Sequence, residues 1–96
     1  MLVNIVFFPP IKPGKEEEFK QWFVWSNEEF IKQEGFVRRK LLVPRGGGNY
    51  VSVVEFTNAE ALQAIQKSPI HAEAQQKVLP LLDGELKLQM YETVDL

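Results

Sequence analysis

The chain has 96 residues, of which 45% are hydrophobic and 25% charged; its net charge is −2 and it has no cysteine. This length predicts one domain, residues 1–96, and the balance of apolar and charged residues is that of a globular protein. The charge gives no support to a nucleic-acid or anionic-membrane partner, no apolar run approaches 18 residues, and disulfides are excluded, so we expect a cytoplasmic protein.

The first half of the chain predicts a strand followed by a helix. Residues 2–8 are β-branched or aromatic, and Asn4 is the only polar one among them. Three prolines in residues 9–13 end the strand. Residues 15–33 then have a helical period, with Gly35 placed to end the helix. The helix carries one stripe at helical spacing: Phe19, Trp22, Phe23, Ser26 and Phe30.

A hairpin follows this helix. Residues 36–43 and 50–56 read as strands, and the sequence "RGGGN" at 45–49 provides the glycines of a flexible loop between them. The loop lacks the lysine and the hydroxyl residue of a phosphate-binding loop, so it predicts no nucleotide site.

Two helix starts and a last strand complete the chain. Thr57 and Glu60 spell a T-x-x-E capping box that opens a short helix to about residue 67. Ser68 and Pro69 are the N-cap and first residue of a further helix that ends near Pro80. Residues 85–94 alternate as a final strand.

The order strand–helix–strand–strand–helix–strand predicts an α+β, ferredoxin-like βαββαβ fold with a split second helix. Both helices then cover one face of a four-stranded sheet, yet the first strand is apolar on both sides, with Leu2, Val6 and Phe8 opposite Val3, Ile5 and Phe7. A bare apolar face is rare in soluble monomers. We therefore expect a homodimer through this sheet face.

Four segments resemble the antibiotic biosynthesis monooxygenase-like family of the dimeric α+β barrel superfamily. They are "KPGKEEEF", "EGFVRRKL", "YVSVVEFTNAEAL" and "SPIHAEAQQKV". The resemblance covers essentially the whole chain and implies a dimeric α+β barrel. It also implies a monooxygenase that oxidises a small aromatic or quinol-type substrate with O₂ and uses no cofactor. Such chemistry needs an apolar cavity, a base and hydrogen-bond donors.

A related branch of the family degrades haem and relies on an Asn, a Trp and a His. The corresponding positions here are Phe7, Ile65 and Gln75, so none of the three matches. Haem degradation is therefore the least favoured activity. Zinc and iron–sulfur sites are nearly excluded, because they need clusters of Cys and His and the chain has one histidine.

His71 is the candidate base. At the third position of its helix the dipole disfavours the imidazolium, which predicts a neutral ring able to accept a proton. The alternative is a partly exposed histidine at a helix end or a dimer contact. Asn4, alone among apolar neighbours, is either a satisfied structural group or a contact to a ligand.

Trp25 and Tyr50 are the other candidate pocket residues. Trp25 lies off the apolar stripe, at a pocket rim or an interface, whereas Trp22 belongs to the stripe and is expected in the core. Tyr50 offers a hydroxyl to a quinone oxygen. Arg39 lies on an apolar strand face, which suggests a bound anion or an ion pair with Glu55.

Two interpretations from other classes remain. The first is a dimeric small-molecule-binding or stress-response protein that uses the same barrel without turnover. Two observations distinguish it from an oxygenase: whether polar groups converge near His71, and whether the protein consumes O₂. An RNA-recognition domain shares the strand order but needs aromatic residues on its third strand. Here Val53 stands where one of them is required.

Overall fold

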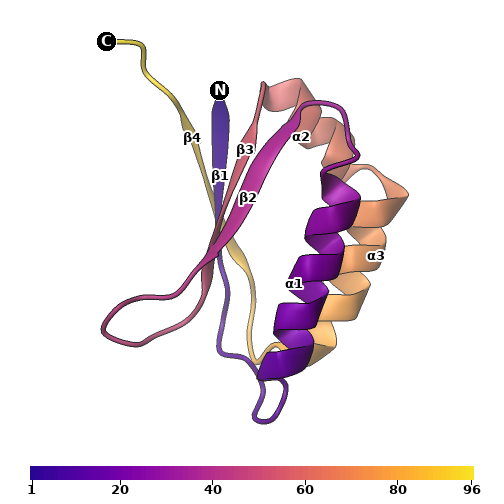
Figure 1. Ribbon diagram of the computed structural model, residues 1–96, viewed down its shortest axis with the longest axis vertical. Coiled ribbons are helices and arrows are strands. Elements are labelled where there is room, and N and C mark those ends of the chain that lie inside the picture. The colour runs from indigo at the N-terminus through magenta and orange to yellow at the C-terminus, as the bar shows by residue number, and fades with distance from the viewer.

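Three helices cover one face of a four-stranded antiparallel sheet in the computed structural model, which describes residues 1–96 (Figure 1). The strands, in the spatial order β2–β3–β1–β4, are β1 (Leu2–Phe7), β2 (Phe36–Leu42), β3 (Val51–Phe56) and β4 (Lys87–Glu92). The helices are α1 (Glu16–Phe30), α2 (Ala59–Gln66), α3 (Pro69–Val78) and the 3₁₀ helix η1 (Leu79–Leu81). The predicted βαββαβ fold with its split second helix is confirmed.

Helix α1 buries the predicted stripe against the sheet, with Phe19 and Ser26 fully inaccessible. It ends at Phe30, three residues before the predicted end. The turn that follows reaches Gly35 with φ +84°, and a Cβ on Gly35 would clash with Cβ of Ala61. A glycine is therefore required here both by the backbone conformation and by the close approach of α2.

Strand β2 contains an irregularity that alternation alone does not predict. Its register with β3 shifts between Phe36 and Arg38, so Val37 is left out of the pairing. Phe36 pairs with Phe56 and Arg39 with Val54, and both partners are buried beneath the helices. Phe36 and Arg39 therefore lie on the same, helix-facing side of the sheet, although in a regular strand residues three positions apart lie on opposite faces.

The sequence predicted the N-cap of α3 correctly and that of α2 incorrectly. Ser68 is the N-cap of α3, as expected, and its hydroxyl accepts a hydrogen bond from the His71 amide at 3.3 Å. The cap of α2 is Asn58 and not Thr57: the Asn58 side chain accepts from the Ala61 amide at 2.9 Å. The capping box was therefore placed one residue too early.

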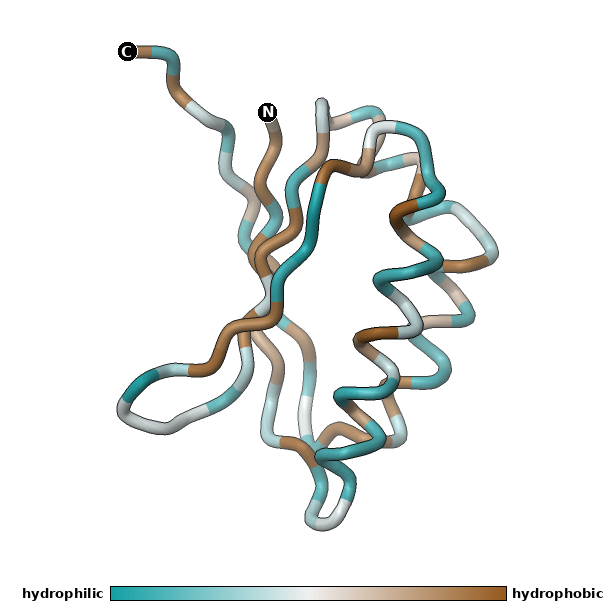
Figure 2. Tube along the Cα trace, viewed as in Figure 1, coloured by the Kyte–Doolittle hydropathy of each residue, from teal (hydrophilic) through white to brown (hydrophobic).

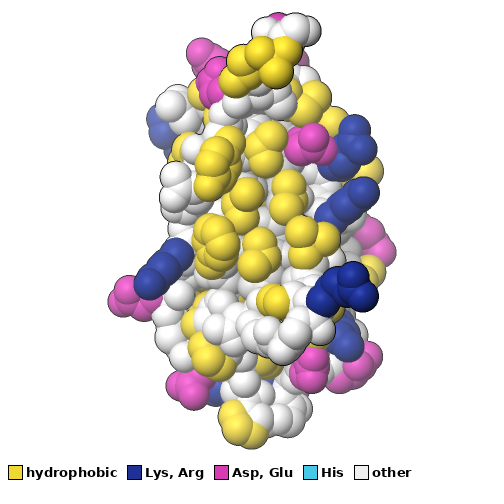
Figure 3. Space-filling model, turned by 90° about the vertical axis from the view of Figure 1, so that its left-hand side faces the viewer, with side chains coloured by type: hydrophobic (Ala, Val, Ile, Leu, Met, Phe, Trp, Pro, Cys, Tyr) yellow, Lys and Arg dark blue, Asp and Glu magenta, His cyan; other side chains and the backbone are white.

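The opposite face of the sheet carries no helix. Burial alternates along β3, where every second residue is buried beneath the helices and the others are half-buried on the open face. Side chains of Val3, Ile5 and Phe7 share that open face, and Phe7 is 43% exposed. Figure 3 shows hydrophobic side chains gathered over its centre, with charged groups toward the margins. We call the face formed by Val3, Ile5, Phe7, Val51 and Val53 the open apolar face.

Hydrophobic residues run along the sheet, whereas hydrophobic and hydrophilic residues alternate in α1 (Figure 2). Helices of this kind pack one side on a sheet and present the other to water. None of them combines the length and apolar character that a membrane crossing requires.

The cap assignment leads to a stability prediction. Asn58→Ala removes the acceptor of the Ala61 amide and should lower the free energy of unfolding by about 0.5–2 kcal/mol. Thr57→Ala, the matched control, removes no cap and should change it less. Urea unfolding followed by circular dichroism measures both, and an equal loss in the two variants would contradict the assignment.

Candidate functional site

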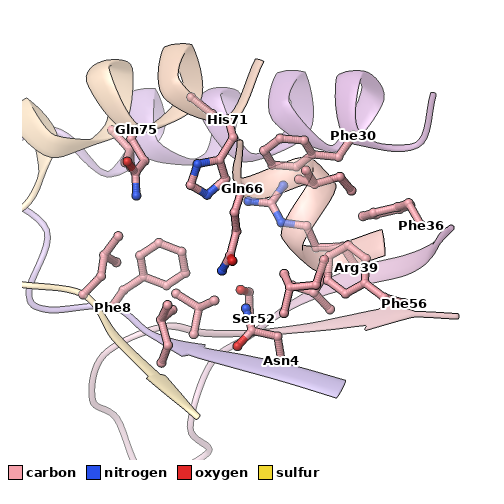
Figure 4. A pocket seen from close by; sticks show the side chains of 18 of the residues that line it. Asn4, Phe8, Phe30, Phe36, Arg39, Ser52, Phe56, Gln66, His71 and Gln75 are labelled. Atoms are coloured by element: carbon pink, nitrogen blue, oxygen red, sulfur yellow. The ribbon is translucent and has the colours of Figure 1, made fainter. Parts of the chain in front are cut away.

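A mostly apolar cavity of about 350 Å³ lies between the sheet and the helices (Figure 4). Its volume falls at the lower end of the range for small-molecule sites. Its walls come from all four strand segments and from α1, α2 and α3. The polar residues in its lining are Asn4, Arg39, Ser52, Gln66, His71 and Gln75.

Two buried polar side chains on adjacent strands form the floor of the cavity. Asn4 is 6% exposed and Ser52 is 1% exposed. Val54 pairs with Asn4 on one side and Arg39 on the other, and Ser52 lies two residues before Val54 on the same face. Neither Oδ1 of Asn4 nor Oγ of Ser52 has a hydrogen-bond partner within the protein. Because buried polar atoms are normally paired, both are suited to bind a ligand.

Arg39 brings a positive charge to the same cavity. Its Nη1 donates to Oγ of Ser26 at 2.8 Å and to the carbonyl oxygen of Phe23 at 3.4 Å. The expected ion pair with Glu55 is wrong, because the pleat places Glu55 on the open apolar face, where it pairs with Arg38. No ion pair of the structure involves Arg39.

The guanidinium of Arg39 contacts three aromatic rings and no carboxylate. Its carbon lies 3.9 Å from the ring centroid of Phe23, 5.2 Å from that of Phe30 and 5.3 Å from that of Trp22. These are cation–π distances. Burial lowers the pKa of Arg39 to about 9, so the group is still charged at neutral pH.

His71 faces the sheet from the first turn of α3 (Figure 4). Its ring lies 6.4 Å from that of Phe30, measured between centroids. Burial lowers the pKa of His71 below its ordinary value, so the imidazole is neutral at pH 7 and can accept a proton. The sequence predicted the neutral state from the helix dipole, whereas desolvation is its main cause in the structure.

The mouth of the cavity lies along the side where the helices leave β4 uncovered. Gln66 at the end of α2 and Gln75 on α3 line the cavity and are exposed. Across from them, Leu88 on β4 is 51% exposed. The solvent-exposed border of the cavity is therefore formed by two amide side chains and a leucine.

Trp25 and Tyr50, expected as pocket residues, do not line the cavity. Trp25 is partly buried on the side of α1 that faces α3, with Nζ of Lys77 4.0 Å from its ring centroid. The Tyr50 hydroxyl bonds to the Glu16 carboxylate, which raises the pKa of Tyr50. Trp25 instead lines a smaller surface hollow that it shares with Trp22 and Lys77, and Glu16 holds the Tyr50 hydroxyl at the surface.

The tryptophan that does line the cavity is Trp22. Its Nε1 donates to the carbonyl oxygen of Ala74 at 2.9 Å, which joins α1 to α3. Trp22 was expected in the core because it belongs to the apolar stripe. The sequence pattern does not distinguish a residue packed in the core from one at a cavity wall.

The positions compared with the haem branch lie in two different places. Ile65 and Gln75 line the cavity, whereas Phe7 lies on the open apolar face, away from it. The structure holds no cluster of three or more His, Cys, Asp or Glu side chains suited to a metal ion.

Comparison with known families gives one match along most of the chain. The family model described as antibiotic biosynthesis monooxygenase matches residues 1–77. No curated protein matches the sequence significantly.

Solved structures share the fold at low sequence identity. A Nitrosomonas europaea protein assigned by name to the antibiotic biosynthesis monooxygenases has a TM-score of 0.86 at 20% identity and covers 99% of this chain and 100% of its own. SnoaB of Streptomyces nogalater, described as a cofactor-independent oxygenase, has a TM-score of 0.82 at 21% identity and covers 99% and 95%. A conserved protein of Methanosarcina mazei has 0.83 at 20% identity, covering 98% and 94%. These similarities show the fold.

The lowered pKa of His71 predicts a pH dependence of stability. Below pH 6.5 the unfolded chain binds a proton at this histidine more readily than the folded chain, so acidification favours unfolding. The wild type should therefore lose stability from pH 7.5 to 5.5, and His71→Gln should lose less. Urea midpoints at several pH values measure this; identical slopes in the two proteins would show that His71 does not contribute.

Proposed function

As this chain belongs to the antibiotic biosynthesis monooxygenase family, we propose that it oxidises a small aromatic, quinol-type substrate with O₂ and without a cofactor. The observation that carries this proposal is the convergence of polar groups around His71. Asn4, Ser52 and Arg39 line the same mostly apolar cavity as the neutral imidazole. A protein that only enclosed an apolar ligand would need none of these buried polar groups.

The reaction requires a base and a shielded site. His71 accepts the proton of a substrate hydroxyl, which leaves an electron-rich anion. This anion supplies the electrons that reduce O₂: one oxygen atom converts a ring C–H bond into C–OH, and the other leaves as water. Hydroquinone and O₂ in this way give hydroxyquinone and water. The aromatic wall formed by Phe8, Trp22 and Phe30 keeps bulk water from the site.

The two unpartnered groups on the floor orient the substrate. Oδ1 of Asn4 accepts a hydrogen bond from a substrate hydroxyl, and Oγ of Ser52 donates one to an oxygen on which charge develops. SnoaB, similar in fold, is described as a cofactor-independent oxygenase, which supports the reaction class.

We also propose that two copies of the chain associate through the open apolar face. Ile5 and Phe7 pair with Val53 and Val51 on it, Val3 lies beside Ile5 on the same face, and no helix of the same chain covers them. Packing two such sheets face to face removes this surface from water.

The activity has a direct test by oxygen electrode. We expect the protein, treated with a chelator and free of flavin, to consume O₂ with a reduced naphthoquinol above the spontaneous rate. His71→Gln should lower this rate by about 10²- to 10⁴-fold, because it removes the base. Gln76→Ala, on the exposed outer side of α3, is the matched control and should leave the rate unchanged. Binding without any O₂ consumption would instead support a non-catalytic binding protein.

The dimer is tested by sedimentation at micromolar protein concentration. Ile5→Glu places a charge at the centre of the open apolar face and should convert dimer to monomer. Val24→Glu alters an apolar residue of α1 that is 57% exposed on the helical side, and it should leave the dimer intact. A wild type that sediments as a monomer would refute the dimer.

A further inference from the structure

The guanidinium of Arg39 is only partly satisfied by the protein. An arginine has five N–H donors. In the structure only Nη1 makes hydrogen bonds, to Ser26 and to the carbonyl oxygen of Phe23. The remaining donors are free at the cavity wall that Arg39 lines. Figure 4 shows the guanidinium reaching from β2 toward the helices, between Phe30 and His71.

The charge around this cavity is unbalanced. No Asp or Glu lies in the lining, and His71 is neutral, so Arg39 supplies its only formal charge. Buried charges are ordinarily paired. Ring contacts stabilise the cation, but they add no negative charge. The cavity lining therefore provides no carboxylate that would balance Arg39.

A second polar region lies at the floor, near the middle of the sheet. Asn4 on β1 and Ser52 on β3 are diagonal neighbours there on the same face of the sheet (Figure 4). Both are more than nine-tenths buried, and their oxygen atoms lack partners. An amide oxygen and a hydroxyl favour a ligand hydroxyl group, which can both donate and accept.

We infer that the cavity takes a hydroxylated aromatic anion, with its ionised oxygen on Arg39 and its hydroxyl group on Asn4 and Ser52. The aromatic part lies between them against the apolar lining. This inference rests on the proposed function for the choice of an aromatic ligand. Its central claim, selection for negative charge by Arg39, concerns binding alone.

A structural role for Arg39 is the competing explanation. In that case the rings of Phe23, Phe30 and Trp22 and the hydroxyl of Ser26 are its sufficient partners. Replacing Arg39 would then lower thermal stability, but it would not alter the preference between a charged and a neutral ligand. Comparing ligand preference with stability therefore separates the two roles.

The test uses two ligands of the same shape that differ in charge, 6-hydroxy-2-naphthoate and 6-hydroxy-2-naphthamide. Neither is a reduced quinol, and binding is measured under nitrogen by ligand fluorescence, so no turnover is involved. We expect the wild type to bind the acid about 10- to 100-fold more tightly than the amide. Arg39→Gln should abolish this preference, and Arg39→Lys should retain part of it, because lysine keeps the charge but not the planar group of donors.

Arg38→Gln is the matched control, since Arg38 is the neighbouring arginine on the opposite face of the sheet. It should keep the full preference for the acid. Equal affinities of the wild type for acid and amide, or an unchanged preference in Arg39→Gln, would overturn the inference. If Arg39→Gln does not fold, the wild-type comparison and Arg39→Lys still decide it. A preference for the acid without O₂ consumption on quinols would retain the anion site and refute the oxygenase.

Discussion

The division of the core into two clusters is the constraint on which the site depends. One cluster gathers Leu2, Phe30, Val54, Phe56, Leu62, Ile65 and Ala74; the other gathers Phe8, Phe19, Val78, Leu81 and Leu82. Trp22 packs against both and is tied to α3 through the Ala74 carbonyl. The indole thus holds α1 and α3 at a fixed spacing above the sheet. The cavity lies where the clusters do not meet, and both contribute to its walls.

Strand alternation accounts for the parts of the site that were predictable from the sequence. It assigned Leu2, Val6 and Phe8 to one face of β1, and the structure places Asn4 between them at the cavity floor. The Ser68–Pro69 start of α3 was equally clear, and it fixes where His71 stands. Such predictions hold because the period of a strand and the chemistry of an N-cap are local properties.

The errors arose where tertiary contacts decide between locally equivalent choices. Trp22 lies in the stripe of α1 and Trp25 just outside it, and the position of α3 determines that Trp22 borders the cavity. Arg39 and Glu55 both lie on apolar strands, but the pairing register separates them onto opposite faces. The shift at Val37 brings Phe36 to the cavity side, and no residue in that segment signals it. The sequence did not identify Ser52 as a cavity residue, because a single serine in a strand is common.

The polar groups at the centre of so small a core weaken the fold. An unpartnered buried group costs about 1–3 kcal/mol, against a total stability of about 5–15 kcal/mol for a domain. Asn4 and Ser52 both carry this cost, and Arg39 adds the desolvation of a charge. Apolar residues at these positions would pack against the adjacent valines and close the cavity. Because Asn4 and Ser52 gain no partner within the fold, and Arg39 lines the same cavity, the common direction of the three side chains supports the ligand site proposed above.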